Sequence, residues 1–96
     1  MNHSSFTESL RYADPPAGLS IQLNSLWYDA KGNWHTAHDL INNLTDPISA
    51  HIHAYLHRKE GDQGNARYWY SRAGKLPCDT SLKAEWEELV RLNTEK

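Results

Sequence analysis

The chain is poor in cysteine, in long apolar runs and in net charge. Cys78 is the only cysteine among 96 residues, which excludes an intramolecular disulfide and a cysteine zinc cluster. No apolar run approaches the roughly 18 residues of a membrane span, and no charged-then-apolar signal segment opens the chain. The net charge of −2 does not favour duplex DNA or an anionic membrane as a partner. We therefore expect a cytoplasmic protein that has no membrane partner. On the same grounds, nucleic acid is not favoured as a partner.

Catalytic signatures are also missing from the sequence. It contains no glycine-rich phosphate loop, no nucleophile elbow and no paired-carboxylate spacing. Cys78 precedes the last expected helix, where a thiol can be acidified, but nothing in the sequence places a histidine beside it. The sequence thus favours a non-enzymatic role. It predicts no cofactor other than the divalent metal considered below.

The period-two alternation of strands is missing too, and apolar residues instead recur at helical spacing. Gly, Asn, Asp and Pro separate these stripes, and these residues end and cap helices. The five expected helices begin near Leu19, Asn33, Asp46, Asp62 and Asp79. Residues 1–16 are polar and end in two prolines, so we expect a flexible N-terminal tail in which Phe6 and Leu10 pin one short helical turn onto the body. Residues 17–96 are expected to form a single all-α domain.

Aromatic side chains must fill much of the core. A chain of this length buries only about 60–65% of its unfolded surface, and it has four Trp, five Tyr and one Phe. The residues expected to be buried are Trp34, Ala37, Ile41, Ile52, Leu56, Ala66, Tyr70 and Trp86.

The chain also repeats part of its own pattern. The pairs that align after a constant shift are Gly32–Gly61, Asn33–Asp62 and Ala37–Ala66. In each copy a glycine ends one helix, a polar residue caps the next, and an alanine lets two helices approach closely. This spacing resembles degenerate tetratricopeptide repeats, which stack because one hairpin cannot bury its apolar face alone. We expect two such hairpins followed by a C-terminal capping helix, with a plain five-helix bundle as the alternative.

Three strings carry a narrower resemblance. WHTAH at residues 34–38, HAYLHRKEGD at 53–62 and NARYWY at 65–70 resemble the hallmark segments of a family of small uncharacterised helical proteins. The resemblance covers roughly residues 19–75. It implies a shared fold and a shared site, and it implies no particular activity.

The histidines of the middle string are the candidate ligands. At 100° per residue, His53, His57 and Glu60 fall within a sector of about 60° on the third helix. Imidazoles at i, i+4 with a carboxylate are a recurring metal-ligand set, and His38 on the second helix is a candidate fourth ligand. The alternative is that the histidines only pack between helices and donate hydrogen bonds.

The candidate contact residues lie around the next turn. Arg58 and Arg72 are expected either to pair with Glu60 or Asp62 or to clamp an anionic ligand. Tyr68 faces away from the core, and an exposed aromatic ring beside arginine suits a protein interface. We therefore predict a protein-interaction module that binds a protein or peptide, or forms a homodimer. The alternative function is a small-ligand or metal site, with hydrolysis as one option, built from the histidines and Glu60.

Overall fold

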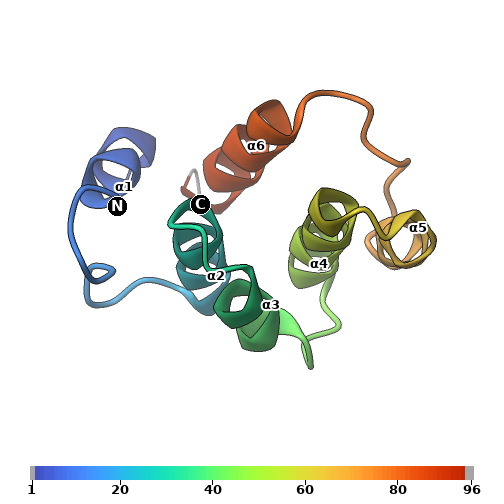
Figure 1. The fold of residues 1–96 in the computed structure, drawn as a ribbon, viewed down its shortest axis with the longest axis horizontal. Coiled ribbons are helices and arrows are strands. Elements are labelled where there is room, and N and C mark those ends of the chain that lie inside the picture. The colour runs from blue at the N-terminus through green and yellow to red at the C-terminus, as the bar shows by residue number, and fades with distance from the viewer. Residues whose placement is uncertain (1, 95–96) are drawn as a thin grey trace.

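The computed structural model describes residues 2–94, and these form six helices without a strand. The helices are α1 (His3–Ser9), α2 (Ile21–Ala30), α3 (Trp34–Ile41), α4 (Pro47–Glu60), α5 (Gln63–Arg72) and α6 (Leu82–Thr94), shown in Figure 1. Residues 1, 95 and 96, the outer ends of the expected tail and domain, lie outside the described residues. The all-α prediction is confirmed, whereas the expected number of five helices is corrected to six. None of the described helices is both long and apolar enough to cross a membrane.

The additional helix, α1, lies in the segment that we expected to be a tail. The side chain of Asn2 accepts a hydrogen bond from the Ser5 backbone N–H at 2.8 Å and so caps the helix. Phe6 is fully buried, and its ring centroid lies 6.1 Å from that of Trp86 on α6. With seven residues, α1 is too short to show a helical stripe in the sequence, so we expected one short helical turn at Phe6 and Leu10 instead of a complete helix.

The α2–α3 and α4–α5 pairs form two helical hairpins with matching joints. Gly32 and Gly61 follow α2 and α4 with φ of 84° and 89°, in the left-handed region that favours glycine. Asn33 and Asp62 then cap α3 and α5 by accepting a backbone N–H three residues later. The sequence repeat thus corresponds to equivalent local structures at the two joints.

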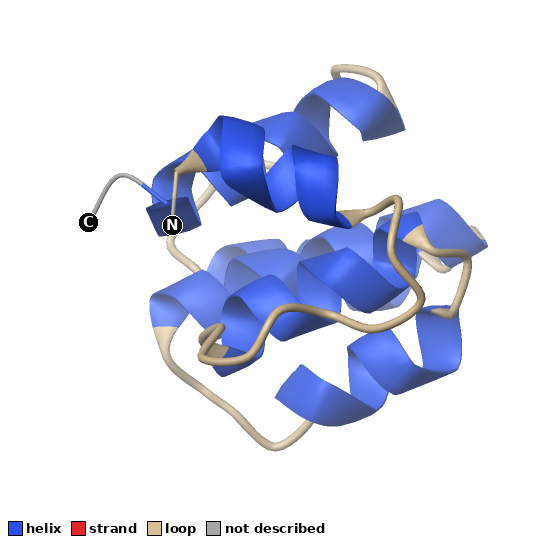
Figure 2. Ribbon diagram, turned by 90° about the vertical axis from the view of Figure 1, so that its left-hand side faces the viewer, coloured by secondary structure: helices blue, strands red, loops and turns tan. Residues whose placement is uncertain are grey.

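Helix α6 packs on α2 and α4, where it covers the apolar core (Figures 1 and 2). Six of the eight residues expected in the core are buried, and Trp34 and Trp86 are only partly buried. Their indole N–H groups donate to the carbonyls of Leu56 and Leu26, at 2.8 and 3.0 Å. A buried indole needs such an acceptor, and these acceptors hold both rings at the edge of the core.

Candidate functional site: a histidine cluster between the hairpins

Three histidine side chains meet where α3 of the first hairpin packs against α4 of the second. His38 comes from α3, and His53 and His57 come from successive turns of α4. His53 is 3% and His57 8% exposed, whereas His38 is partly open to solvent. One ring nitrogen from each residue lies within 4.8 Å of the other two. We call these three residues the histidine cluster.

The rings of His38 and His53 point their Nε2 atoms at one another. His38 Nε2 lies 3.1 Å from His53 Nε2, and the two rings are nearly perpendicular. Two lone pairs at this distance repel, so the two atoms share either a proton or a cation. The ring of His57 stacks on that of His53 with centroids 4.8 Å apart, which places the third imidazole beside this pair.

Glu60 joins the cluster through His57. The Glu60 Oε2 atom lies 2.6 Å from His57 Nδ1, and the Glu60 side chain is 38% exposed. A carboxylate accepts the proton of Nδ1, and this leaves the lone pair of the neutral ring on Nε2. Glu60 therefore fixes both the orientation and the tautomer of His57. The structure brings together all four residues of the alternative site that the sequence predicted.

Two tryptophan rings enclose the cluster. Trp34 stacks on His38 with centroids 4.9 Å apart and 8° between the planes. Trp69 of α5 stacks on His53 at 4.0 Å and 14°. Sequence reasoning assigned Trp34 to the core and Trp69 to the flank of α5, and it did not connect either ring with the histidines. Trp34 lies one turn from Ala37 and Trp69 one turn from Ala66, at positions where helices approach closely. This spacing was the sequence signal that could have placed both rings beside the histidines.

The surroundings favour the neutral forms of His38 and His53. Burial, together with the neighbouring His38 and His57, lowers the pKa of His53 to about 4. Burial and His57 likewise lower the pKa of His38. Neutral imidazoles retain a lone pair for a metal ion, whereas imidazolium ions do not.

The hydrogen bonds of the histidine cluster are incomplete. His53 Nδ1 is buried and has no hydrogen-bond partner among the residues that the structure describes. Whichever tautomer His53 adopts, a buried donor or acceptor is left unsatisfied, at a cost of about 1–3 kcal/mol. Packing would be better served by an apolar ring at this position, so packing alone does not account for a histidine.

The two arginines lie outside the histidine cluster. Arg58 reaches α6, where it donates to Glu85 Oε1 at 2.9 Å and to the carbonyl of Thr80. Arg72 donates to the Tyr68 hydroxyl at 2.9 Å, on the outer side of α5. The expected pairing of these arginines with Glu60 or Asp62 is therefore not what the structure contains. Helical geometry explains the difference, because Arg58 follows His57 by 100° and points to another neighbour.

A second polar group, built around Glu85, was missed in the sequence. Glu85 is 2% exposed and accepts from Tyr70 Oη at 2.6 Å and from Arg58, with His51 Nε2 at 3.4 Å. Burial alone would raise the pKa of the Glu85 carboxyl, but the hydrogen bonds from His51, Tyr70 and Arg58 outweigh it and lower that pKa. We call these four residues the Glu85 network. Tyr70 and Arg58 lie 15 and 27 positions from Glu85 in the sequence, and His51 lies farther still, so no local motif reveals the network.

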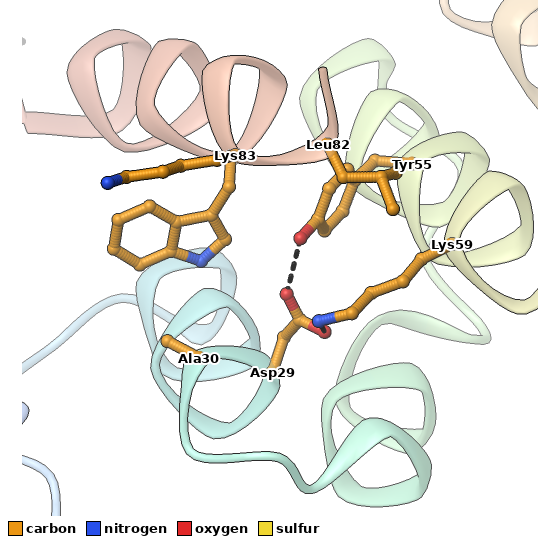
Figure 3. Close-up of a pocket in the computed structure, with 7 residues that line it drawn as sticks. Asp29, Ala30, Tyr55, Lys59, Leu82 and Lys83 are labelled. Carbon is orange, nitrogen blue, oxygen red and sulfur yellow. Dashed lines mark hydrogen bonds and ion pairs between the residues drawn. The ribbon is translucent and has the colours of Figure 1, made fainter.

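A third polar group lines a pocket of about 240 Å³ between α2, α4 and α6 (Figure 3). Asp29 accepts from the Tyr55 hydroxyl at 2.6 Å and from Lys59 Nζ at 2.9 Å. Both carboxylate oxygens of this buried residue are thereby used, and Figure 3 shows them turned toward these partners. Asp29 therefore offers no unused carboxylate oxygen to a ligand, and its two contacts hold α2 and α4 together.

The chain matches no family model, no curated protein and no solved structure. A function must therefore be inferred from its own residues. The fold supplies two observations for that purpose: a cluster of three imidazoles, and an outer helix with an exposed aromatic and basic face.

Proposed function

We propose that the protein is an interaction module of two degenerate tetratricopeptide-like hairpins, and that the outer face of α5 docks an acidic protein surface. The position of α5 is the observation that carries this proposal. Among the described helices, α5 packs mainly against α4, although the Tyr70 hydroxyl reaches Glu85 of α6, and α5 lies at one end of the molecule (Figure 1). In a stacked array of hairpins the next repeat would cover this face, but here α6 turns back onto α2 and α4 instead.

The outer face of α5 combines the aromatic ring of Tyr68 with the guanidinium group of Arg72. Tyr68 is 51% exposed, and the Arg72 guanidinium lies 5.8 Å from the Tyr68 ring centroid and 5.6 Å from that of Trp69. Aromatic contact and the hydrogen bond to Tyr68 hold the arginine in one orientation, which reduces the entropy lost when it binds a carboxylate. Tyrosine and arginine are the residues most often found at the centres of protein interfaces.

Charge separation supports an acidic partner. Residues 63–75 contain Arg67, Arg72 and Lys75 and no Asp or Glu, a local charge of +3. Because the whole chain carries −2, the remainder carries −5. The basic face attracts an acidic protein segment, while the rest of the molecule repels an extended polyanion such as a single-stranded nucleic acid.

The test is binding of a fluorescent peptide rich in Asp and Glu, followed by anisotropy. We expect salt-sensitive binding that Tyr68→Ala weakens and that Arg72→Glu abolishes, with Lys83→Glu on α6 as the matched control of equal charge change. Equal loss in the control variant would contradict a site on α5. Stronger binding of a single-stranded oligonucleotide of equal charge would contradict a protein partner.

Self-association is the other arrangement that the sequence predicts. A light-scattering mass of a dimer at high micromolar concentration would support the expected homodimer. If Arg72→Glu converts that dimer to a monomer, the outer face of α5 binds a second copy and the proposal of an acidic partner is overturned. If the dimer persists, the two surfaces are separate and the proposal stands.

A further inference from the structure

We infer that the histidine cluster is a transition-metal site, in which His38, His53 and His57 bind one zinc-class divalent ion and Glu60 positions His57. The site goes beyond the docking function because it lies between the hairpins and not on the outer face of α5. Three side chains from two helices each bring one ring nitrogen within 4.8 Å of the other two.

The spacing of the nitrogens fits a tetrahedral ion. Zinc binds histidine nitrogen at about 2.0–2.1 Å, so two nitrogens on one tetrahedral ion lie about 3.3 Å apart. His38 Nε2 and His53 Nε2 are 3.1 Å apart, within a few tenths of an ångström of that value. The α3–α4 contact has therefore already brought two ligands to bonding separation. His57 offers a ring nitrogen within 4.8 Å of one on each of the other two residues, and it would have to move closer to complete the set.

Glu60 supplies the support that metal-binding histidines usually have. A ligating imidazole commonly donates its other N–H to a carboxylate, which orients the ring and increases its basicity. The 2.6 Å contact from Glu60 Oε2 to His57 Nδ1 has this form. It leaves His57 Nε2 as the ligand atom. Since Glu60 is partly exposed and does not itself need to bind the ion, it acts as a positioning residue.

The second acidic group near His57 does not compete for this role. Asp62 lies close enough to His57 and Glu60 to complete another set of ligands. Its two carboxylate oxygens, however, accept from the backbone N–H and side-chain amide of Asn65, at 3.2 and 2.7 Å. Asp62 is thus committed to capping α5, and the histidine cluster is the better site.

The donor set selects the kind of metal. Three imidazoles suit Zn²⁺, Cu²⁺ and Ni²⁺, whereas Mg²⁺ and Ca²⁺ prefer oxygen ligands. With three protein ligands the fourth position is left for water or an exogenous ligand, and the partial exposure of His38 gives solvent a way to reach it. Binding would link α3 to α4 and so fasten the first hairpin to the second.

The experiment is calorimetric titration of metal-stripped protein with zinc chloride, with native mass spectrometry for stoichiometry. We expect one zinc ion per chain. Glu60→Ala should weaken binding by about 10–100-fold, and His53→Gln or His38→Gln should weaken it more. Glu60→Gln should recover part of the loss, because its amide oxygen still accepts from His57 Nδ1. The matched control is His35→Gln, an exposed histidine on the same helix as His38, which should leave binding unchanged.

Cobalt substitution keeps the test valid if a histidine variant fails to fold. Wild-type protein with one equivalent of Co²⁺ should show the intense visible absorption of a tetrahedral ion and quench the fluorescence of Trp34 and Trp69, which stack on the ligands. A weak octahedral spectrum would overturn the inference. So would zinc binding that His35→Gln reduces as much as His38→Gln does, or the absence of a one-to-one complex.

Discussion

The histidine cluster and the Glu85 network are buried polar groups that each include two residues of α4, and they differ in how completely their atoms are paired. Glu85 receives hydrogen bonds from Tyr70 and Arg58 at its two oxygens, so its charge is compensated inside the fold. His53 leaves one nitrogen unpaired among the described residues and directs the other at a second imidazole. A complete set of partners indicates a structural role, whereas two imidazole nitrogens that face each other can hold a cation between them.

The largest effect should come from breaking the Glu85 network. Glu85→Gln removes the charge that compensates Arg58, and loss of one partner of a buried pair costs about 3–5 kcal/mol. Chemical denaturation should show a fall of this size in the free energy of unfolding. Glu87→Gln, at an exposed position on the same helix, is the control and should change it by about 0.5 kcal/mol or less. A Glu85→Gln variant as stable as wild type would contradict a structural role for the Glu85 network.

The histidine cluster and the Glu85 network should lose their contributions to stability in different pH ranges. The pKa of His53 is about 4 in the folded chain and about 6.5 unfolded, so the unfolded state takes up the proton first. Metal-free protein should therefore lose roughly 3 kcal/mol of stability as the pH falls from 6.5 to 4. The lowered pKa of Glu85 acts in a different range: its contribution is present above the unfolded pKa and is lost below about 4.5.

Urea denaturation at a series of pH values checks this separation. In the His53→Gln variant the decline between pH 6.5 and 4 should flatten, while the steeper loss at lower pH should remain. A wild-type stability that does not change between pH 7 and 5 would show that His53 protonates as easily in the folded chain as in the unfolded one.

The Asp29 group provides an intermediate effect. Tyr55→Phe removes a hydrogen bond to a buried carboxylate, and bonds to charged groups contribute about 1.5–3 kcal/mol. Thermal or urea unfolding should show that loss, because the hydroxyl has a structural task like that of Tyr70. The exposed Tyr12→Phe serves as the control. An unchanged Tyr55→Phe variant would mean that Lys59 alone compensates Asp29.

A smaller effect is expected in the histidine cluster itself. His38→Gln should lower the stability of the metal-free protein by less than about 1 kcal/mol, because one partly exposed contact to an incompletely paired ring is lost. In the presence of zinc the gap between variant and wild type should widen, since only the wild type is stabilised by the ion. Melting curves with and without zinc measure both quantities. A gap of the same size in the two curves would favour packing as the only role of His38.

The smallest effect belongs to the outer face of α5. Tyr68→Ala should change the free energy of unfolding by about 0.5 kcal/mol or less, because the ring is exposed and its contacts with Trp69 and Arg72 lie within its own helix. Circular dichroism melting checks this. A large loss of stability would mean that Tyr68 supports the fold and is not reserved for binding a partner.

Local signals in the sequence were sufficient for the joints and for the histidines. Capping residues act on their own neighbours, so the helix end at Gly61 and the cap at Asp62 were predictable. The i, i+4 spacing of His53 and His57 places them on one face of α4 whatever the fold. The contribution of His38 followed from the expectation that two hairpins pack side by side.

Partners on distant segments were not predictable. Arg58 finds Glu85 across 27 positions, and the sequence offered the nearer Glu60 and Asp62 as equally suitable charges. The seven-residue helix α1 owes its place to the burial of Phe6 against α6, a contact that no periodicity encodes. In both cases tertiary packing, and not local propensity, decides the structure.

The most direct test of the comparison is a long-range ¹H–¹⁵N spectrum of the histidine side chains, recorded while zinc is added to the metal-free protein. His51 belongs to the Glu85 network and serves as an internal control in the same spectrum. We predict that the ring nitrogens of His38, His53 and His57 shift together and saturate at one equivalent of zinc, while those of His51 do not move. Shifts that appear first at His51 or at the exposed His35, with the three clustered rings unchanged, would contradict the account.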